Sequence, residues 1–336
     1  MGLSWALPIP AKLRLDADFL LASSAQIMYL LYSIHRLWSI KGYKAHAQGV
    51  IMNTVLPYKP NLVSKKVSKS CTHPNEKGGV GKTTILFHQA YRLAEKGFKV
   101  LVVDFDGQRN ISKLFLGSMS EVAWVEKNGF TAADLFRPDL KNEDITLYKS
   151  SVHTNISIIP SHKEKIANIL AAGVNAKNMV LNPKKYLDLI DVDFILIDTP
   201  PSLGVTQVAA MYAVDKIFVP VTVDDYSNEG FISLLNTLKV VKTNLRSKTE
   251  LAGVYVNKFK KPSTRKGDNP YLDILNQIKR DYSSFLFPIF IPDSLPINEA
   301  RMSARPCWIN PPNGNAATVG RTVRKAIDAL NEKLIS

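Results

Sequence analysis

The chain contains 336 residues, with 43 Lys or Arg and 29 Asp or Glu, and its formal net charge is +14. Its two cysteines, Cys71 and Cys307, argue against a disulfide framework and against an iron–sulfur cluster, because such clusters need closely spaced thiolates. This cysteine usage is typical of an intracellular protein, so we expect a cytoplasmic location.

Residues 1–52 are expected to form an N-terminal extension. Apolar residues recur at helical spacing over residues 19–40, but Gln26, His35 and Arg36 interrupt the stripe. A membrane span needs about 20 predominantly apolar residues, and a signal peptide needs a cleavage site that is not evident in this segment. The spacing therefore predicts an amphipathic helix that packs on a partner or on the chain's own domain.

Residues 53–75 are rich in Pro, Ser and Lys, a composition that predicts a polar linker. The end of this segment would also have to supply the first strand of a parallel sheet. Such strands are usually apolar, whereas residues 65–75 are polar and contain Pro74. Either this first strand is short and poor, or the residues before Asn75 are not the natural ones, for instance because of a shifted reading frame or a true start near Met52. One large domain is expected over residues 76–336.

Residues 77–84 read Lys-Gly-Gly-Val-Gly-Lys-Thr-Thr, a pattern suited to wrapping backbone N–H groups around phosphates. Glycines in this loop can adopt positive φ angles and bring the amides close to an anion. Apolar residues recur at helical spacing over residues 85–96, so the positive end of a helix would face the same anion. The expected nucleotide contacts are Gly78, Gly79, Val80, Gly81, Lys82, Thr83 and Thr84.

Three side chains at the end of this loop have separate expected roles. Lys82 would reach the β and γ phosphates as a point charge, and the Thr83 hydroxyl would ligate Mg²⁺. Thr84 is placed to bond the α phosphate. The loop therefore predicts a nucleotide site that holds Mg²⁺.

Two later segments are continuous apolar runs that end in carboxylates. Residues 99–106 place Asp104 and Asp106 at the end of one run, and residues 194–198 place Asp198 at the end of the other. Such runs are typical of strands buried on both faces of a parallel sheet, where ligands bind at the carboxyl ends. Strands that alternate with helices predict a doubly wound, mostly parallel α/β fold.

The common P-loop pattern has a glycine where this chain has Glu76, and Lys77 precedes the glycine pair. This arrangement resembles the deviant Walker A motif of the ParA and MinD ATPases, and the resemblance covers about residues 77–336. It implies a P-loop ATPase that uses ATP with Mg²⁺ and forms a homodimer with two ATP molecules between its subunits. In such a dimer Lys77 reaches the nucleotide of the partner subunit, so Lys77 and Lys82 are implied as catalytic residues.

The acidic residues match the same family. The resemblance implies that Asp106 positions the attacking water and that Thr83, Asp104 and Asp198 surround the Mg²⁺ ion, with Asp198 acting through water. Residues 107–110 read Gly-Gln-Arg-Asn, a departure from the commoner Pro-Gln-Gly-Asn of ParA proteins.

Two later positions are similar to the family's base-binding residues. Asn257 ends an apolar run over residues 251–257 and looks like the adenine-contacting asparagine. Pro292 lies in residues 290–306, which resemble the ParA segment that closes over the base. An asparagine at a strand end is more often a turn former, and this alternative stays open for Asn257.

A basic segment follows Asn257, and its cations have no acidic residue between them: Lys258, Lys260, Lys261, Arg265 and Lys266. The simpler interpretation is a solvated surface loop. In a two-fold dimer the segment would be duplicated and could form a track for the phosphates of double-stranded DNA, without sequence preference. We therefore expect nonspecific DNA binding and association with the nucleoid.

Three functions are compatible with these features. The first is a partitioning ATPase that dimerises on ATP, binds DNA and is released when a ParB-like partner stimulates slow hydrolysis. The second is a MinD-like membrane-positioning ATPase, which would need a basic amphipathic C-terminal helix. Residues 319–334 instead mix Arg324 and Lys325 with Asp328 and Glu332, which favours packing on the domain, so no membrane partner is expected. The third is a nucleotide-gated scaffold with negligible turnover.

Overall fold

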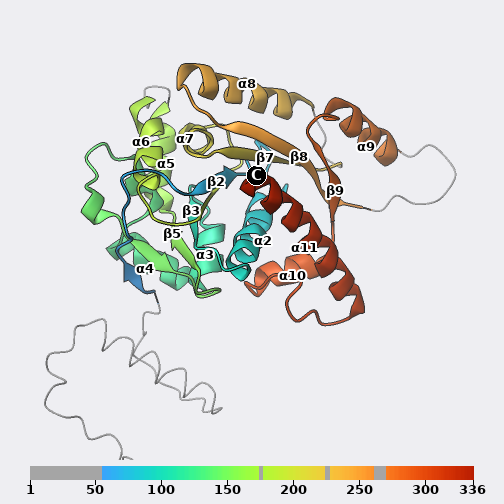
Figure 1. Cartoon of the computed structure of the whole chain (residues 1–336), viewed down its shortest axis with the longest axis horizontal. Coiled ribbons are helices and arrows are strands. Elements are labelled where there is room, and N and C mark those ends of the chain that lie inside the picture. Colours follow the sequence, from blue (N-terminus) through green and yellow to red (C-terminus); the bar gives the residue numbers. More distant parts are fainter. Residues whose placement is uncertain (1–54, 174–176, 224–227, 261–269) are drawn as a thin grey trace, which may run out of the picture. The chain divides into compact units, whose positions relative to one another are not determined.

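The computed structural model describes residues 55–173, 177–223, 228–260 and 270–336 (Figure 1). The chain divides into two units, and the fold given below is that of the unit Val55–Ser336. The amphipathic helix predicted over residues 19–40 lies outside the described residues.

A nine-stranded sheet runs through this unit, in the order β1-β4-β5-β3-β6-β2-β7-β8-β9 among the described residues. Neighbouring strands are parallel except around β4, which pairs antiparallel with β1 and β5. The strands in chain order are β1 (Pro57–Tyr58), β2 (Lys69–Thr72), β3 (Val100–Asp104), β4 (Leu147–Lys149), β5 (Ile156–Ile159), β6 (Phe194–Asp198), β7 (Lys216–Val221), β8 (Glu250–Phe259) and β9 (Leu286–Pro292).

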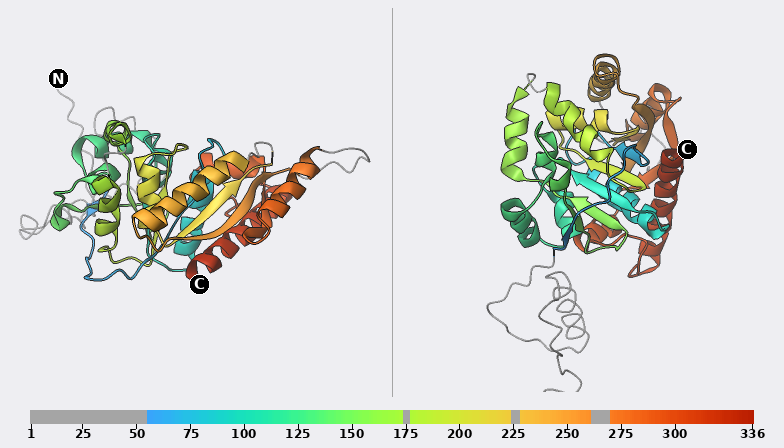
Figure 2. Two further views of the ribbon diagram at one scale, coloured as in Figure 1. Left: turned by 90° about the horizontal axis from the view of Figure 1, so that it is seen from above. Right: turned by 60° about the vertical axis from the view of Figure 1, so that its left-hand side comes forward.

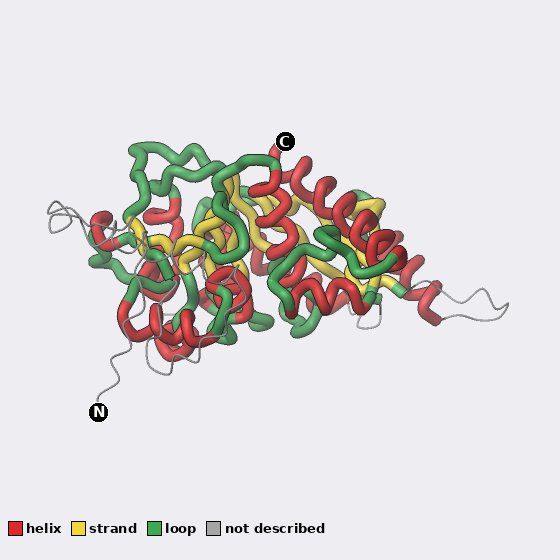
Figure 3. Tube along the Cα trace, turned by 90° about the horizontal axis from the view of Figure 1, so that it is seen from below, coloured by secondary structure: helices red, strands yellow, loops and turns green. Residues whose placement is uncertain are grey.

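Helices cover both faces of the sheet, so the strands lie between two helical layers (Figures 2 and 3). One hydrophobic core lies under α2 (Lys82–Glu95), α3 (Asn110–Leu116), α4 (Met119–Asn128), α10 (Leu295–Met302) and α11 (Gly314–Ile335). The other lies under α5 (Lys163–Ala171), α6 (Lys177–Leu187), α7 (Val205–Ala213), α8 (Asn228–Asn244) and α9 (Pro270–Asp281). Two short 3₁₀ helices, Ala132–Phe136 and Asn142–Asp144, connect α4 to β4. The predicted doubly wound, mostly parallel α/β fold is confirmed.

The strands β3 and β6 carry the acidic motifs. All five residues of each strand are buried, as expected for apolar runs that are covered on both faces. Their parallel register pairs Val100 with Phe194 and Asp104 with Asp198. The two carboxylates therefore lie next to each other at the carboxyl edge of the sheet.

The short, polar first strand expected from the sequence is β2, which lies in the middle of the sheet between β6 and β7. Its buried hydroxyl groups have partners. The Thr72 hydroxyl donates to the Ile197 carbonyl over 2.8 Å, and the N–H and hydroxyl of Ser70 both donate to the Asp215 carboxylate. Side-chain hydrogen bonds thus allow a polar strand in a central position.

A buried polar chain follows β2 and joins three elements. His73 is 1% exposed, its Nε2 lies 2.7 Å from Gln89 Oε1 on α2, and its Nδ1 lies 3.0 Å from the Tyr255 hydroxyl on β8. The Gln89 oxygen can only accept, so Nε2 donates and Nδ1 accepts from Tyr255. This chain fixes the end of β2 from which the glycine-rich loop departs.

The segment predicted as a linker differs in the structure. The compact unit begins at Val55, which is buried, and β1 pairs with β4 at one edge of the sheet. Lys66 forms an ion pair with Asp215 over 2.9 Å. The domain boundary therefore lies near residue 55 instead of residue 76. The polar composition was misleading because hydrogen bonds and ion pairs, more than apolar packing, attach this segment.

The C-terminal helix α11 packs on α2. Its residues Ile327 and Leu330 are buried, while Asp328 bonds Arg92 over 2.9 Å and Lys96 over 2.8 Å. The mixed charges of α11 thus serve packing on the domain, as the sequence predicted. Within the described ranges, no helix combines the length and the apolar character that a membrane span requires.

Candidate nucleotide-binding site

A cavity of about 330 Å³ opens at the carboxyl edge of the sheet, where an α/β fold of this kind binds ligands. We call it the P-loop cavity. Its lining combines the glycine-rich loop, the segment after β3, the segment after β6, the end of β8, and α10: Gly79, Gly81, Lys82, Thr83, Thr84, Asp106, Gln108, Asn110, Pro201, Lys258, Asn298 and Arg301.

Two glycines give the loop its shape. Gly79 has φ +75° and Gly81 has φ +92°, a region that favours glycine, and Gly81 directly precedes the first residue of α2. A side chain at Gly81 would collide with the Asn257 amide. The Asn257 Nδ2 donates to the Val80 carbonyl over 2.7 Å, so the predicted base-contacting residue lies directly against the loop.

Lys82 is held at the base of the loop. Its Nζ donates to the carbonyl oxygens of Asn75 and Lys77, each over 3.0 Å, and the side chain is buried. Burial lowers the pKa of Lys82, whereas the nearby Asp198 and Asp106 act in the opposite direction. The ammonium group is therefore placed beneath the amides that would surround a phosphate.

The Thr83 hydroxyl and Asp198 meet at the predicted metal position. Thr83 Oγ1 donates to Asp198 Oδ2 over 2.7 Å, and Asp198 Oδ1 is buried with no hydrogen-bond partner among the described residues. Burial raises the pKa of Asp198 to about 7. A hydroxyl oxygen beside a carboxylate oxygen that lacks a partner is a donor set suited to Mg²⁺, so these residues fit the ion.

Asp104 has a different environment from the one predicted. Its Oδ1 accepts from the Asp106 N–H over 2.9 Å, and its Oδ2 accepts from the Ser112 N–H and hydroxyl. Burial and the neighbouring Asp198 raise the pKa of Asp104 well above its usual range. Because both its oxygens already accept hydrogen bonds, unlike Asp198 Oδ1, the position of Asp104 favours orienting Asp106 over binding a metal.

Asp106 lies in the lining of the P-loop cavity and is buried. Its Oδ1 accepts from the Gln108 N–H over 2.9 Å, which fixes the carboxylate relative to the turn that follows β3. Burial raises the pKa of Asp106. The geometry places a carboxylate opposite Lys82 and Thr83, where it could hold a water molecule.

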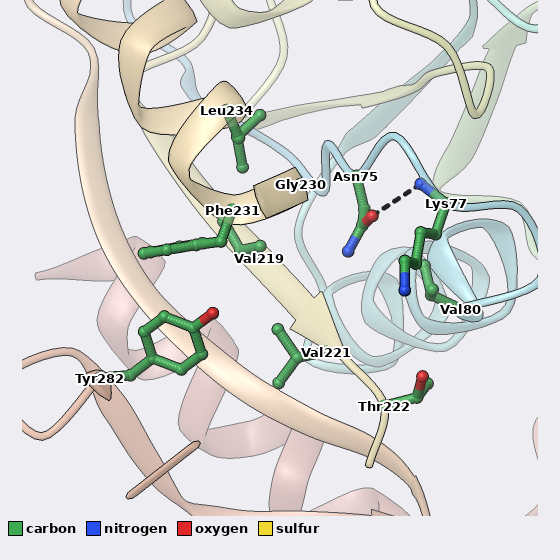
Figure 4. A pocket seen from close by; sticks show the side chains of 10 residues that line it. All are labelled: Asn75, Lys77, Val80, Val219, Val221, Thr222, Gly230, Phe231, Leu234 and Tyr282. Atoms are coloured by element: carbon green, nitrogen blue, oxygen red, sulfur yellow. Dashed lines mark hydrogen bonds between the residues drawn. The ribbon is translucent and has the colours of Figure 1, made fainter. Parts of the chain in front are cut away.

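Lys77 lies in the lining of a separate cavity of about 30 Å³, which is too small for a nucleotide (Figure 4). The Lys77 N–H donates to Asn75 Oδ1 over 2.8 Å, and Asn75 Nδ2 donates to the Pro220 carbonyl on β7 over 2.6 Å. Asn75 thus attaches the loop to the sheet. We did not predict this role, although asparagine before a glycine-rich turn is a known signal for a local side-chain-to-backbone bond.

The remaining predicted site residues lie in different surroundings from one another. Pro292 ends β9 and is half-buried outside the P-loop cavity. Lys258, predicted to bind DNA, has φ +52° and lines the cavity. The backbone N–H of Lys260 donates to the Tyr271 hydroxyl, and the Lys260 residue is exposed. Lys261, Arg265 and Lys266 lie outside the described residues.

Two residues of α10 also line the cavity, and both belong to residues 290–306, the segment whose resemblance predicted a position over the base, although neither was predicted as a site residue. Asn298 and Arg301 are one helical turn apart, so both face the same space. His88 on α2 connects this helix to the segment that follows α10. Its Nδ1 lies 2.7 Å from the Thr84 carbonyl, also on α2, and its Nε2 accepts from the N–H of Cys307 over 3.3 Å. The wall contributed by α10 is thereby linked to the start of α2.

The fold, the glycine-rich loop and the Thr83–Asp198 pair define a P-loop nucleotide-binding protein. A family model described as an AAA domain matches residues 68–251. The chain is 30% identical over 236 residues to the chromosome-partitioning ATPase Soj of Treponema pallidum, covering 70% of this chain and 87% of that protein. It is 28% identical over 262 residues to the sporulation initiation inhibitor protein Soj of Bacillus subtilis, covering 76% and 96%.

Solved structures agree in fold. An alanine variant of Cyanothece McdA in complex with ATP has a TM-score of 0.65 at 20% identity, covering 79% of this chain and 97% of that chain. Together with the relatives, this agreement confirms the resemblance seen in the sequence. The chain belongs to the ParA/MinD family of ATPases.

Proposed function

We propose that this protein is a partition ATPase that dimerises on binding ATP, binds double-stranded DNA without sequence preference, and is released when a ParB-like partner stimulates slow hydrolysis. The observation that carries the proposal is the convergence of Lys82, Thr83 and Asp106 on one cavity. The similarity to two Soj proteins, one of them named a chromosome-partitioning ATPase, supports it. The proposed location is the cytoplasm, in association with the nucleoid.

The residues of the cavity divide the chemistry between them. The amides of the loop and the Lys82 ammonium would bind phosphate oxygens and neutralise the charge that develops on them. Thr83 and, through water, Asp198 would hold Mg²⁺, which supplies Lewis-acid polarisation of a phosphoryl oxygen. Asp106 would orient the attacking water. Asn257 remains the proposed contact to the base, because its amide already reaches the loop.

Dimerisation is proposed on the basis of Lys77. This lysine lies outside the P-loop cavity of its own chain, which supports a role toward the nucleotide of the partner subunit. The proposed DNA surface retains Lys260 with Lys261, Arg265 and Lys266, whereas the position of Lys258 in the cavity favours a role near the nucleotide. The ion pairs between α11 and α2 do not support a lipid-binding C-terminal helix.

The proposal is tested by measuring molar mass and DNA retention with ATP, with ADP and without nucleotide. We expect a dimer and retention of unrelated DNA duplexes with ATP alone, and Lys77→Ala should bind ATP yet remain monomeric. Sedimentation with anionic liposomes in ATP would instead indicate a membrane-positioning ATPase. Dimerisation without measurable phosphate release, even with DNA and a partner present, would indicate a nucleotide-gated scaffold.

A further inference from the structure

We propose that Arg109 and Glu126 form an ion-pair latch that holds residues 106–110 in place, so that Arg109 is a positioning residue for Asp106. The inference rests on the proposed ATPase function. Neither residue of the latch lines the P-loop cavity, whereas Asp106, Gln108 and Asn110 do. The latch would therefore act on hydrolysis through the segment that carries these three residues.

The backbone of Arg109 defines the turn between β3 and α3. Arg109 has φ 60° and ψ 25°, the left-handed region that favours glycine, and it directly precedes α3. Its N–H donates to the Asp106 carbonyl over 2.9 Å, which closes the turn. Because Gln108 and Asn110 flank Arg109, the conformation of this one residue determines how both enter the cavity.

The side chain of Arg109 attaches this turn to two helices. Its Nη1 bonds Glu126 Oε2 over 2.9 Å, and the two side chains are only 20% and 14% exposed. The second oxygen of the same carboxylate, Oε1, accepts from the N–H of Lys163 over 2.7 Å, in the first turn of α5. One carboxylate thus joins the turn, α4 and α5.

The helix α5 also touches both acidic segments directly. A Cβ atom on Gly107 would lie 3.6 Å from the Lys163 carbonyl oxygen and from Ile166 Cγ2. A Cβ atom on Gly204, in the segment that follows Asp198, would lie 2.8 Å from Leu170 Cδ2. The latch therefore anchors residues 106–110 to a helix that packs against the Asp198 segment as well.

The latch is poorly suited to be a device for stability alone. A non-glycine residue in the left-handed region is strained, and Arg109 Nε is buried with no hydrogen-bond partner among the described residues. Both features oppose folding. Local features that oppose folding are concentrated at functional sites, which favours a role in positioning the turn.

Arg109→Gly and Glu126→Gln, singly and together, test the latch. Glycine relieves the backbone strain while removing the ion pair, so a loss of activity cannot be attributed to strain. Lys113→Gln, one turn along α3, is the matched control because it removes an exposed positive charge. For each variant we would measure ATP affinity by fluorescence titration, single-turnover hydrolysis, and amide hydrogen exchange of residues 106–110 without nucleotide.

We expect both single variants to hydrolyse ATP about 10-fold more slowly, since a small misplacement of a reacting group has effects of this size or larger. Their ATP affinity should stay within about twofold, because the loop residues are unchanged. The double variant should be no slower than either single variant, and amide exchange of residues 106–110 should be faster in all three. Lys113→Gln should match the parent.

Parental hydrolysis in both single variants, or additive losses in the double variant, would overturn the latch, as would unchanged amide exchange. If the parent protein neither binds nor hydrolyses ATP, the proposed function fails. The exchange measurement needs no nucleotide and still decides whether Arg109 and Glu126 hold the turn.

Discussion

Lys82 places one ammonium group beneath the glycine-rich loop, held by two backbone carbonyls that a phosphate could replace as partners. Lys82→Ala removes this charge, and we expect ATP affinity to fall by about 10- to 100-fold, the range for a lost charge-assisted hydrogen bond. Isothermal titration calorimetry measures the change, with Lys325→Ala on the exposed face of α11 as the control. Unchanged affinity would show that the loop is not the phosphate site.

Asp106 differs from Lys82 because its proposed contact forms only with the attacking water. Asp106→Ala should bind ATP about as well as the parent but hydrolyse it roughly 100-fold more slowly, since the lost interaction stabilises the transition state more than the ground state. Phosphate release under saturating ATP gives the rate. Asp139→Ala, at an exposed ion pair, is the control. Parental turnover in Asp106→Ala would remove the residue from the mechanism.

The positions of site residues were predictable from the sequence where one short motif contains both the backbone shape and the side chain. Thr83 and Asp198 meet as expected, because Thr83 lies at the end of the glycine-rich loop and Asp198 is the last residue of a buried strand. The hydrogen bonds of Asp104 could not be predicted, because its orientation depends on Ser112 in the next helix. Arg301 could not be singled out within residues 290–306, because only the fold brings this one side chain to a loop that lies more than 200 residues upstream.

At the scale of elements, His88 connects α2 to the segment after α10, and its burial gives the protein a pH-dependent stability. Burial lowers the pKa of His88 to about 4 from 6.5, so the unfolded chain binds a proton between these values and the folded chain does not. The free energy of unfolding therefore falls as pH falls below about 6.5, by roughly 1.4 kcal/mol per pH unit from this residue.

His88→Asn should reduce that dependence, because an amide can donate and accept without binding a proton. Urea unfolding of parent and variant at pH 7.5 and 5.5 isolates the effect of His88. Parent and variant must be compared because other buried groups also make the free energy of unfolding depend on pH. The lowered pKa of His73 contributes with the same sign as that of His88, whereas the raised pKa of Asp198 contributes with the opposite sign. His162→Asn, at a half-exposed helix cap, is the control. An equal pH dependence in parent and His88→Asn would contradict the assignment.

The N-terminal boundary leads to a second prediction about elements. A chain that starts at Met52 retains every strand of the described sheet and every residue of the cavity. We expect it to fold and to hydrolyse ATP at the parental rate, whereas a chain that starts at residue 76 should not fold, because it lacks the central strand β2. Circular dichroism and phosphate release test both. Loss of ATP binding in a folded chain starting at Met52 would assign residues 1–51 to the site.

The central strands β3 and β6 could be predicted from apolar runs alone, since burial on both faces leaves an unambiguous pattern. The position of β1 and the extent of the domain could not. Their contacts depend on partners such as Tyr148 and Asp215, which are distant in sequence and give no periodic signal.

For the whole molecule, the proposed DNA surface implies a strong dependence on salt. ATP-dependent DNA binding should weaken with salt by a log–log slope of about −0.9 per neutralised phosphate. Lys260→Glu combined with Arg265→Glu should flatten the slope and reduce affinity equally for unrelated duplexes, because phosphate contacts carry no base information. Fluorescence anisotropy over a salt series measures both effects.

The matched control reverses two charges elsewhere, Lys113→Glu with Lys127→Glu, which are exposed on α3 and α4. It should keep the parental slope. If the Lys260 and Arg265 variant also keeps that slope while still binding ATP, the DNA surface lies elsewhere in the chain, and residues 1–70, with nine Lys or Arg, are the next region to test.

The buried chain of His73, Gln89 and Tyr255 has an evolutionary consequence. Gln89 and Tyr255 each supply a hydrogen-bond partner to the His73 ring, so replacing any one of the three alone removes a partner from a polar group in the core. Related sequences should therefore exchange these three positions together, either as a polar set or as apolar side chains. The same dependence means that grafting this loop into another member of the family would require transferring residues from α2 and β8 along with it.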